Sequence, residues 1–147
     1  MRCSMSFVTF ATGGLMVLAL VSAQVSAQTF TTLHSFNGAD GANPGRSLTV
    51  TPDGSTLYGT TYLGGGTIFS IPVGGGPLTT LASFNGPNGY WPLGGLTLSG
   101  STLYGMTIYG GTFGYANGGS GYGTIFSIPV GGGTLTTLYS FDGTNGK

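Results

Sequence analysis

Residues 66–76 read GTIFSIPVGGG, and residues 123–133 read GTIFSIPVGGG again. The likeness continues downstream, where residues 78–84 and 135–141 share the pattern Leu-Thr-Thr-Leu-x-Ser-Phe. A third version of that pattern, Thr-Thr-Leu-His-Ser-Phe, begins at Thr31. Repetition that covers a whole module of this length indicates a fold built from structural repeats.

The spacing of the copies gives the size of the repeat. The Thr-Thr-Leu motif starts at residues 31, 79 and 136, so successive copies are 48 and 57 residues apart. Upstream, Ser-Thr-Leu-Tyr-Gly occurs at 55–59 and again at 101–105. The second repeat is longer because it contains an extra glycine-rich and aromatic loop at residues 110–122.

Within each repeat, four short runs are rich in β-branched and aromatic residues and are bounded by Gly, Pro, Asn or Asp, which is typical of β-strands joined by turns. Pro52-Asp53-Gly54 is a turn sequence that predicts a hairpin between the first two runs. Each repeat is therefore predicted to be a four-stranded antiparallel meander. The eight predicted strands are 47–51, 56–62, 66–73, 78–84, 95–98, 102–109, 123–130 and 135–141.

A four-stranded meander with a period of about 40 to 50 residues is typical of one blade of a β-propeller. We therefore predict an all-β fold of propeller-like blades. A signal peptide at 1–27 would precede a β-repeat domain at 28–147, which holds about two units and so predicts an incomplete propeller. The expected parts of that domain are a partial unit at 28–38 with a fourth-strand copy at 30–36, unit 1 at 39–86, unit 2 at 87–143 and the start of a truncated unit at 144–147.

Three linked motifs also carry a family resemblance. They are Leu-Tyr-Gly-Thr-Thr at 57–61, Gly-Tyr-Gly-Thr-Ile-Phe at 121–126, and the recurring Thr-Thr-Leu-x-Ser-Phe-Asn-Gly. Their combination over residues 29–147 resembles the GloVer tandem-repeat family. The resemblance implies an exported bacterial protein with propeller-like repeats, from a group with varied C-terminal anchors. The resemblance adds location and architecture only, because it does not point to a molecular activity.

The N-terminus has the three-part layout of a secretory signal peptide. Arg2 precedes an apolar core at 15–21, and small residues end at Ala27. An uncleaved membrane helix is the alternative, but the core is well short of the ~20 residues that a membrane span needs. We expect a secreted or cell-surface protein with no membrane span after cleavage at residue 27. Cys3 is the one cysteine, so the mature chain would have no disulfide.

Charged residues are only 4% of the chain and the net charge is zero, which disfavours a nucleic-acid partner. The repeats test the remaining polar candidates. His34 is replaced by Ala82 and Tyr139 in the other copies, and Asp142 is replaced by Asn. Acid–base catalysis or metal binding needs several such groups close together. We therefore predict no catalytic residue, no metal site and no cofactor.

Loop aromatic residues are the remaining candidates for binding. Aromatic rings can stack on the apolar faces of sugars while neighbouring amides and hydroxyls supply hydrogen bonds. The alternative is that these rings cap the sheets or pack between them. The candidate ligand-binding residues are Tyr90, Trp91, Tyr109, Phe113, Tyr115 and Tyr122.

Three functional hypotheses follow. The first is an exported, noncatalytic β-repeat module that acts as a surface or secreted scaffold or interaction domain. The second is a glycan-binding module that uses the loop aromatics, and the third is a fragment of a propeller hydrolase or lyase. The expected partners are a glycan or cell-surface polymer, and further copies of the chain that associate through open sheet faces and edges.

Overall fold

The structure, a computed structural model, describes residues 28–113 and 121–145. The chain divides after Phe30, and both sheets belong to the unit that begins at Thr31. The predicted signal peptide lies outside the described residues. Within them, no helix has the length and apolar character needed to cross a membrane.

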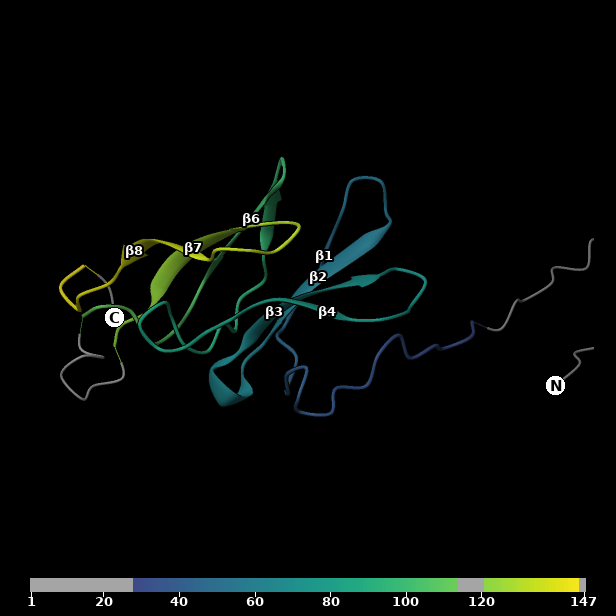
Figure 1. Cartoon of the computed structure of the whole chain (residues 1–147), viewed down its shortest axis with the longest axis horizontal. Coiled ribbons are helices and arrows are strands. Elements are labelled where there is room, and N and C mark those ends of the chain that lie inside the picture. Colours follow the sequence, from purple (N-terminus) through teal and green to yellow (C-terminus); the bar gives the residue numbers. More distant parts are fainter. Residues whose placement is uncertain (1–27, 114–120, 146–147) are drawn as a thin grey trace, which may run out of the picture. The chain divides into compact units, whose positions relative to one another are not determined.

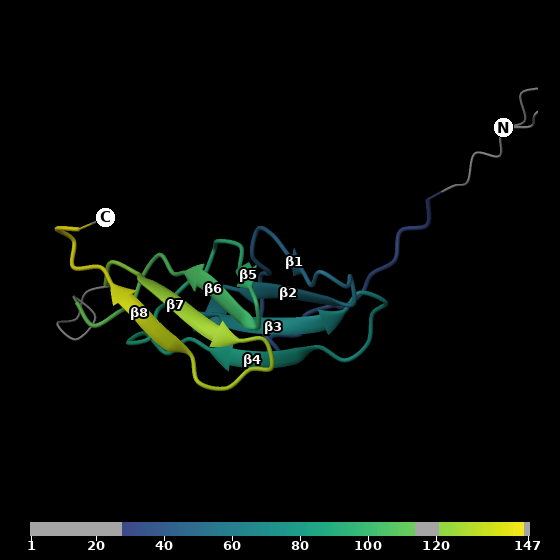
Figure 2. The same ribbon diagram turned by 90° about the horizontal axis from the view of Figure 1, so that it is seen from above.

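The described residues form two four-stranded antiparallel sheets and no α-helix (Figures 1 and 2). Strands follow one another in chain order in both sheets, β1-β2-β3-β4 and β5-β6-β7-β8. This confirms the all-β fold and the two predicted meanders. The strands are β1 (Thr49–Val50), β2 (Thr56–Thr61), β3 (Thr67–Pro72), β4 (Thr79–Ser83), β5 (Thr97–Ser99), β6 (Thr102–Met106), β7 (Thr124–Pro129) and β8 (Thr136–Ser140).

The two sheets have the same internal register. Gly59 pairs with Phe69 across β2 and β3, and Gly105 pairs with Phe126 across β6 and β7. The ladder to the fourth strand is irregular immediately before the phenylalanine in both sheets. Identical segments with similar flanking residues have thus found the same pairing, as expected when the buried face specifies register.

The β1–β2 connection is the hairpin expected from its Pro-Asp-Gly turn. The amide of Gly54 donates to the carbonyl of Thr51 at 2.9 Å, and Gly54 has a φ of 71°. Glycine adopts this left-handed conformation without steric cost. The Asp53 carboxylate accepts from the amide of Ser55 at 3.1 Å, so this side chain stabilises the turn. A short 3-10 turn, η1 (Leu63–Gly65), joins β2 to β3.

The core lies between the two sheets. The ring of Phe84, at the end of the first sheet, meets that of Phe126 edge-on at 5.0 Å between centroids. Burial of such large apolar side chains is the main source of stability in a small β-domain. The buried core cluster consists of Tyr58, Ile68, Phe84, Leu96, Leu103, Phe126 and Ile128.

The fourth-strand copy predicted at residues 30–36 forms no strand. Its sequence matches that of β4 and β8, but no neighbouring strand pairs with it among the described residues. A strand needs a partner for its backbone groups, so strand-like sequence alone is insufficient. Phe36 instead packs edge-on against Phe69 at 5.2 Å between ring centroids.

Burial differs between the repeats. The repeated sequence predicts that Leu81 and its counterpart Leu138 are both buried, but Leu138 is 52% exposed. Leu81 is partly buried against the core, which the second sheet completes. No described sheet covers the corresponding side of the second sheet. Position in the assembly of sheets, rather than the local sequence, sets the burial of this residue.

Candidate functional site

Four aromatic side chains meet where the segment between the two sheets passes the η1 turn. Trp91 is at their centre, with ring centroids 5.9 Å from Tyr90, 5.5 Å from Tyr109 and 6.3 Å from Tyr62. The Tyr90 and Trp91 rings are stacked, and the other two pairs meet edge-on. We call these four residues the aromatic cluster. It brings together three of the six predicted binding residues.

Backbone hydrogen bonds hold this cluster between the two repeats. The amide of Trp91 donates to the carbonyl of Gly65 in η1, and the carbonyl of Trp91 accepts from Ile108 after β6. Tyr90 and Tyr109 exchange two backbone hydrogen bonds, of 2.7 and 3.0 Å. The rings are therefore carried on backbone that is tied to both sheets, which gives them a defined position.

The backbone of Trp91 is left-handed, with a φ of 59°. When the repeats are aligned on their Phe-Asn-Gly motifs at 36–38 and 84–86, Trp91 is equivalent to Asn43, which has a φ of 55°. Asparagine tolerates this conformation well, whereas a bulky residue adopts it at a cost of about 1–2 kcal/mol. The fold thus requires the left-handed position in both repeats, and the second repeat places a tryptophan there despite the strain.

The ring surfaces of the cluster are in part open to solvent. Tyr109 is 38% exposed, and Tyr62, Tyr90 and Trp91 are half-buried. The hydroxyl of Tyr62 also accepts a 3.3 Å hydrogen bond from the Asn43 side-chain amide. Flat apolar rings with hydroxyl and amide groups beside them are the surface chemistry that suits the face of a sugar ring.

The other predicted aromatics lie elsewhere. Phe113 is 50% exposed, and Tyr122 is 44% exposed with its ring against Gly143, where an added Cβ would stand 2.7 Å from it. Tyr115 lies outside the described residues. Sequence reasoning missed Tyr62, since it follows a strand of the other repeat. The alignment of Asn43 with Trp91 in the two repeats is a signal in the sequence that could have pointed to this junction.

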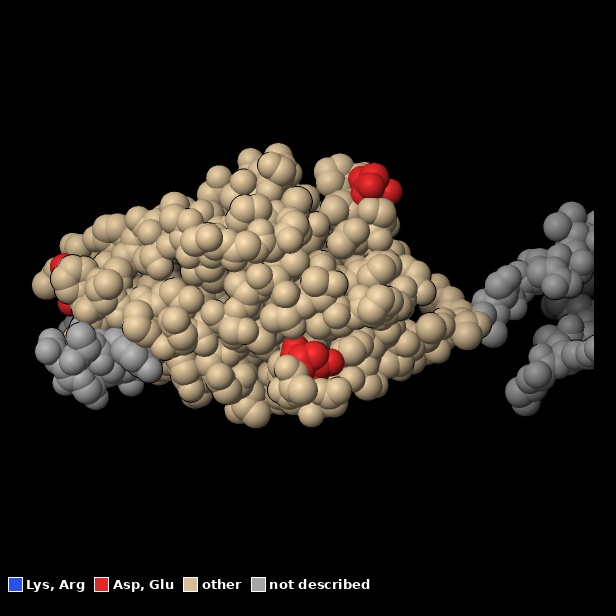
Figure 3. Space-filling view, in the orientation of Figure 1, with Lys and Arg blue, Asp and Glu red and all other residues tan. Residues whose placement is uncertain are grey.

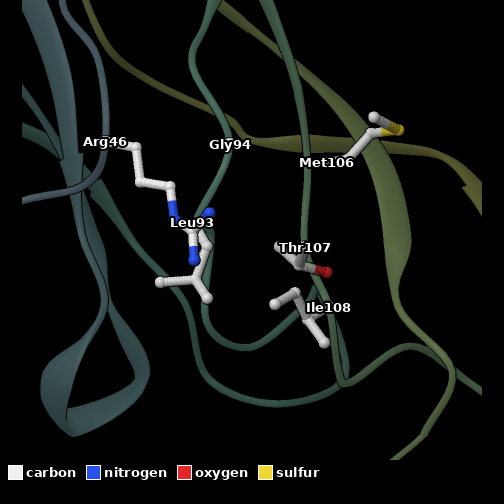
Figure 4. A pocket seen from close by; sticks show the side chains of 6 residues that line it. All are labelled: Arg46, Leu93, Gly94, Met106, Thr107 and Ile108. Atoms are coloured by element: carbon white, nitrogen blue, oxygen red, sulfur yellow. The ribbon is translucent and has the colours of Figure 1, made fainter.

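An open groove of about 410 Å³ lies beside the same inter-sheet segment (Figure 4). Figure 4 shows Arg46, from the loop before β1, reaching toward Leu93 and Gly94. A mostly apolar wall with one guanidinium group could hold an apolar group next to a carboxylate or hydroxyl. The groove is lined by Arg46, Leu93, Gly94, Met106, Thr107 and Ile108.

The three aspartates of the described chain lie in separate turns. A backbone hydrogen bond from Asn37 and a side-chain hydrogen bond from His34 hold the pKa of Asp40 below its ordinary value. Side-chain hydrogen bonds from Thr51 and Ser55, with the amide of Ser55, lower the pKa of Asp53. Asp142 likewise accepts from the amides of Thr144 and Asn145, so local donors occupy all three carboxylates. On the face shown in Figure 3, the acidic side chains form separate patches among uncharged residues.

His34 and Asp40 make a side-chain hydrogen bond, with 2.6 Å between Nε2 and Oδ2. The third repeat copy has an equivalent contact, in which Asn145 donates to the hydroxyl of Tyr139 at 2.6 Å. Each pair ties a residue of the Thr-Thr-Leu-x-Ser-Phe motif to the turn that follows the motif. No group of three or more His, Cys, Asp or Glu side chains is placed to hold a metal ion in the described part of the chain.

A family model, the Gloeobacter/Verrucomicrobia repeat, matches residues 12–147. The chain belongs to this family. The match spans both sheets and the segment that carries Trp91, so the aromatic cluster lies within the family repeat. Searches of curated proteins and of solved structures gave no match.

Proposed function

We propose that this Gloeobacter/Verrucomicrobia repeat chain is an exported, noncatalytic β-repeat module that acts as a surface or secreted scaffold or interaction domain. In this proposal its sheets are propeller-like blades, and the N-terminal 27 residues are the export signal. The arrangement of the acidic groups carries the proposal: each aspartate accepts hydrogen bonds from residues of its own turn. Such carboxylates stabilise loops and are poorly placed to act together on a substrate.

A second candidate function is carbohydrate binding at the aromatic cluster. The observation that favours it is the strained backbone of Trp91 beneath a partly open set of rings. Strain that persists in a fold is often associated with a functional position. The cluster has no charged member, so stacking and hydroxyl hydrogen bonds would dominate recognition, and a neutral polysaccharide fits best.

Trp91→Asn is the informative variant for this candidate. Asparagine occupies the equivalent position 43 with nearly the same φ, so the variant removes the ring and keeps the backbone conformation. We expect binding to an immobilised polysaccharide panel to weaken by roughly 1–3 kcal/mol, as for an exposed aromatic anchor. Phe113→Ser, which removes an exposed ring outside the cluster, is the control and should bind like the wild-type chain.

Self-association through open sheet faces remains a prediction of its own. It concerns a different part of the molecule from the aromatic cluster and has a different readout. Loss of polysaccharide binding and loss of self-association are therefore separable outcomes.

A further inference from the structure

Each sheet has two faces, because neighbouring residues of a strand point to opposite sides. The strand registers assign the side chains to them. The forward face, as we call it, carries Tyr58, Thr60, Ile68 and Ala82 in the first sheet, and Tyr104, Met106, Ile125 and Tyr139 in the second. The rear face carries Val50, Leu57, Phe69 and Ile71 in the first sheet, and Leu98, Leu103, Phe126 and Ile128 in the second.

Within the chain, the forward face of the first sheet packs on the rear face of the second. Tyr58 is 6% exposed and Ile68 is fully buried, and both belong to one cluster with Leu103 and Phe126 of the second sheet. The hydroxyl of Thr49 also donates to the carbonyl of Leu96 across this junction. Forward face against rear face is thus a contact that this sequence forms.

The forward face of the second sheet has no such cover in the described structure. Tyr104 is 39% exposed and Met106 59% exposed, whereas their first-sheet counterparts Tyr58 and Thr60 are 6% and 2% exposed. Tyr139 and Leu138 are 43% and 52% exposed. The chain therefore presents one half of its own internal interface to solvent, and the exposed side chains are apolar or aromatic.

The complementary half is also present and is open along β1. Its other side is covered, since Phe69 and Ile71 are 3% and 4% exposed and Phe36 packs on Phe69. On the rear face of the first sheet, Val50 is 52% exposed, and Leu48 beside it is 55% exposed. In the second sheet the counterpart of Leu48 is Leu96, which is only 7% exposed in the core. One molecule thus displays two different surfaces that match the two sides of a contact already formed inside it.

From this geometry we propose that copies of the chain associate head to tail: the forward face of the second sheet of one copy packs on the rear face of the first sheet of the next. The two surfaces differ, so the contact is heterologous. It gives a ring if the rotation between copies closes and a filament if it does not.

Residues 31–36 would compete with an incoming copy for the rear face of the first sheet. They have the motif of residues 136–141, and Phe36 and Leu33 lie against Phe69 and Gly75 on the first sheet, where a preceding sheet would supply its fourth strand. Residues 31–36 belong to no strand. Displacement by an incoming copy would therefore break side-chain packing without breaking a β-ladder.

Three variants of residues with the same exposed fraction test the proposal in the purified chain. Leu138→Glu places a charge beside the forward face, Val50→Glu places one on the rear face, and Leu63→Glu alters η1, which lies on neither face; each of these residues is 52% exposed. Sedimentation velocity over a concentration series gives the association constant. Circular dichroism and a thermal melt show that each variant is folded.

We expect the wild-type chain and Leu63→Glu to associate with similar constants. The association constants of Leu138→Glu and Val50→Glu should be lower by about tenfold or more, because the contact would desolvate the added charge. An equal mixture of Leu138→Glu and Val50→Glu should form 1:1 heterodimers, since one intact surface of each kind remains. A wild-type chain that stays monomeric at its highest soluble concentration would overturn the proposal. So would a mixture of the folded variants that gives no heterodimer while the wild-type chain associates.

Discussion

The ring of Phe126 lies over Gly105 on the neighbouring strand so closely that a Cβ added at Gly105 would stand 2.5 Å from Cζ of the ring. Phe69 covers Gly59 in the first sheet at the same distance. Gly105→Ala should therefore destabilise the fold by about 1–3 kcal/mol, as overpacking of a well-filled core does. Urea denaturation of the purified variant measures this directly.

Gly131→Ala is the matched control for that substitution. A Cβ added at Gly131 would have no atom within 4 Å, and Gly131 is not among the residues with positive φ. We expect a change within about 0.5 kcal/mol, as is usual for surface substitutions. If the two alanine variants unfolded at the same urea concentration, the close packing of phenylalanine on glycine would not be a determinant of this fold.

The left-handed backbone of Trp91 predicts an order of stability for two variants. Trp91→Asn and Trp91→Ala both remove the ring, but only asparagine tolerates the φ of 59° readily. The asparagine variant should be the more stable by about 1 kcal/mol. Thermal and urea melts of the two proteins make the comparison, and a more stable alanine variant would argue against a left-handed conformation at residue 91.

The sequence predicted both meanders because the repeated segments contain their own strand and turn signals. Ile68 and Phe69 lie in a segment identical to that of Ile125 and Phe126, and the two have the same register. Exposure was less predictable, since Leu81 and Leu138 have nearly the same local sequence and different neighbours. Local sequence specifies pairing within a sheet, while burial depends on which sheet lies next to it.

The candidate site was predicted in part. Tyr90 and Trp91 were visible as adjacent loop aromatics, but Tyr62 joins them only because η1 folds toward the segment between the sheets. Phe113 and Tyr122 are as aromatic and as glycine-flanked as Tyr109, yet they lie apart from the cluster. Nothing in loop composition distinguishes these cases, since the difference arises from tertiary hydrogen bonds.

The packing of Phe36 and Phe84 predicts different effects for equivalent substitutions. Phe84 is 5% exposed in the core, so Phe84→Ala should cost about 3–5 kcal/mol of folding free energy. Phe36 is only half-buried, and Phe36→Ala should loosen residues 31–36 and strengthen head-to-tail association in sedimentation velocity. Adding Leu138→Glu should reverse that gain. Association that survives the double substitution would point to nonspecific aggregation instead.

The turn after β8 predicts a pH effect. Hydrogen bonds from the hydroxyl and then the amide of Thr144, with one from the amide of Asn145, hold the pKa of Asp142 below its ordinary value. A carboxyl group with a lowered folded-state pKa stabilises the fold above its unfolded pKa, and this contribution disappears as the pH falls through the folded-state value. Thr144→Ala removes the largest cause, so the pKa of Asp142 should rise toward the ordinary range in a carboxyl-carbon NMR titration. An unchanged pKa would contradict this geometry.

A binding experiment with product detection tests most directly whether the chain is a noncatalytic module and whether its aromatic cluster binds carbohydrate. The wild-type chain and Trp91→Asn are incubated with a panel of cell-envelope polysaccharides, and bound protein and polysaccharide length are measured together. The account predicts retention of the wild-type chain by at least one polysaccharide, no shortened products, and binding weaker by about tenfold or more for Trp91→Asn at an unchanged melting temperature. Shortened products would contradict a noncatalytic module, and equal retention of both proteins would contradict binding at the aromatic cluster.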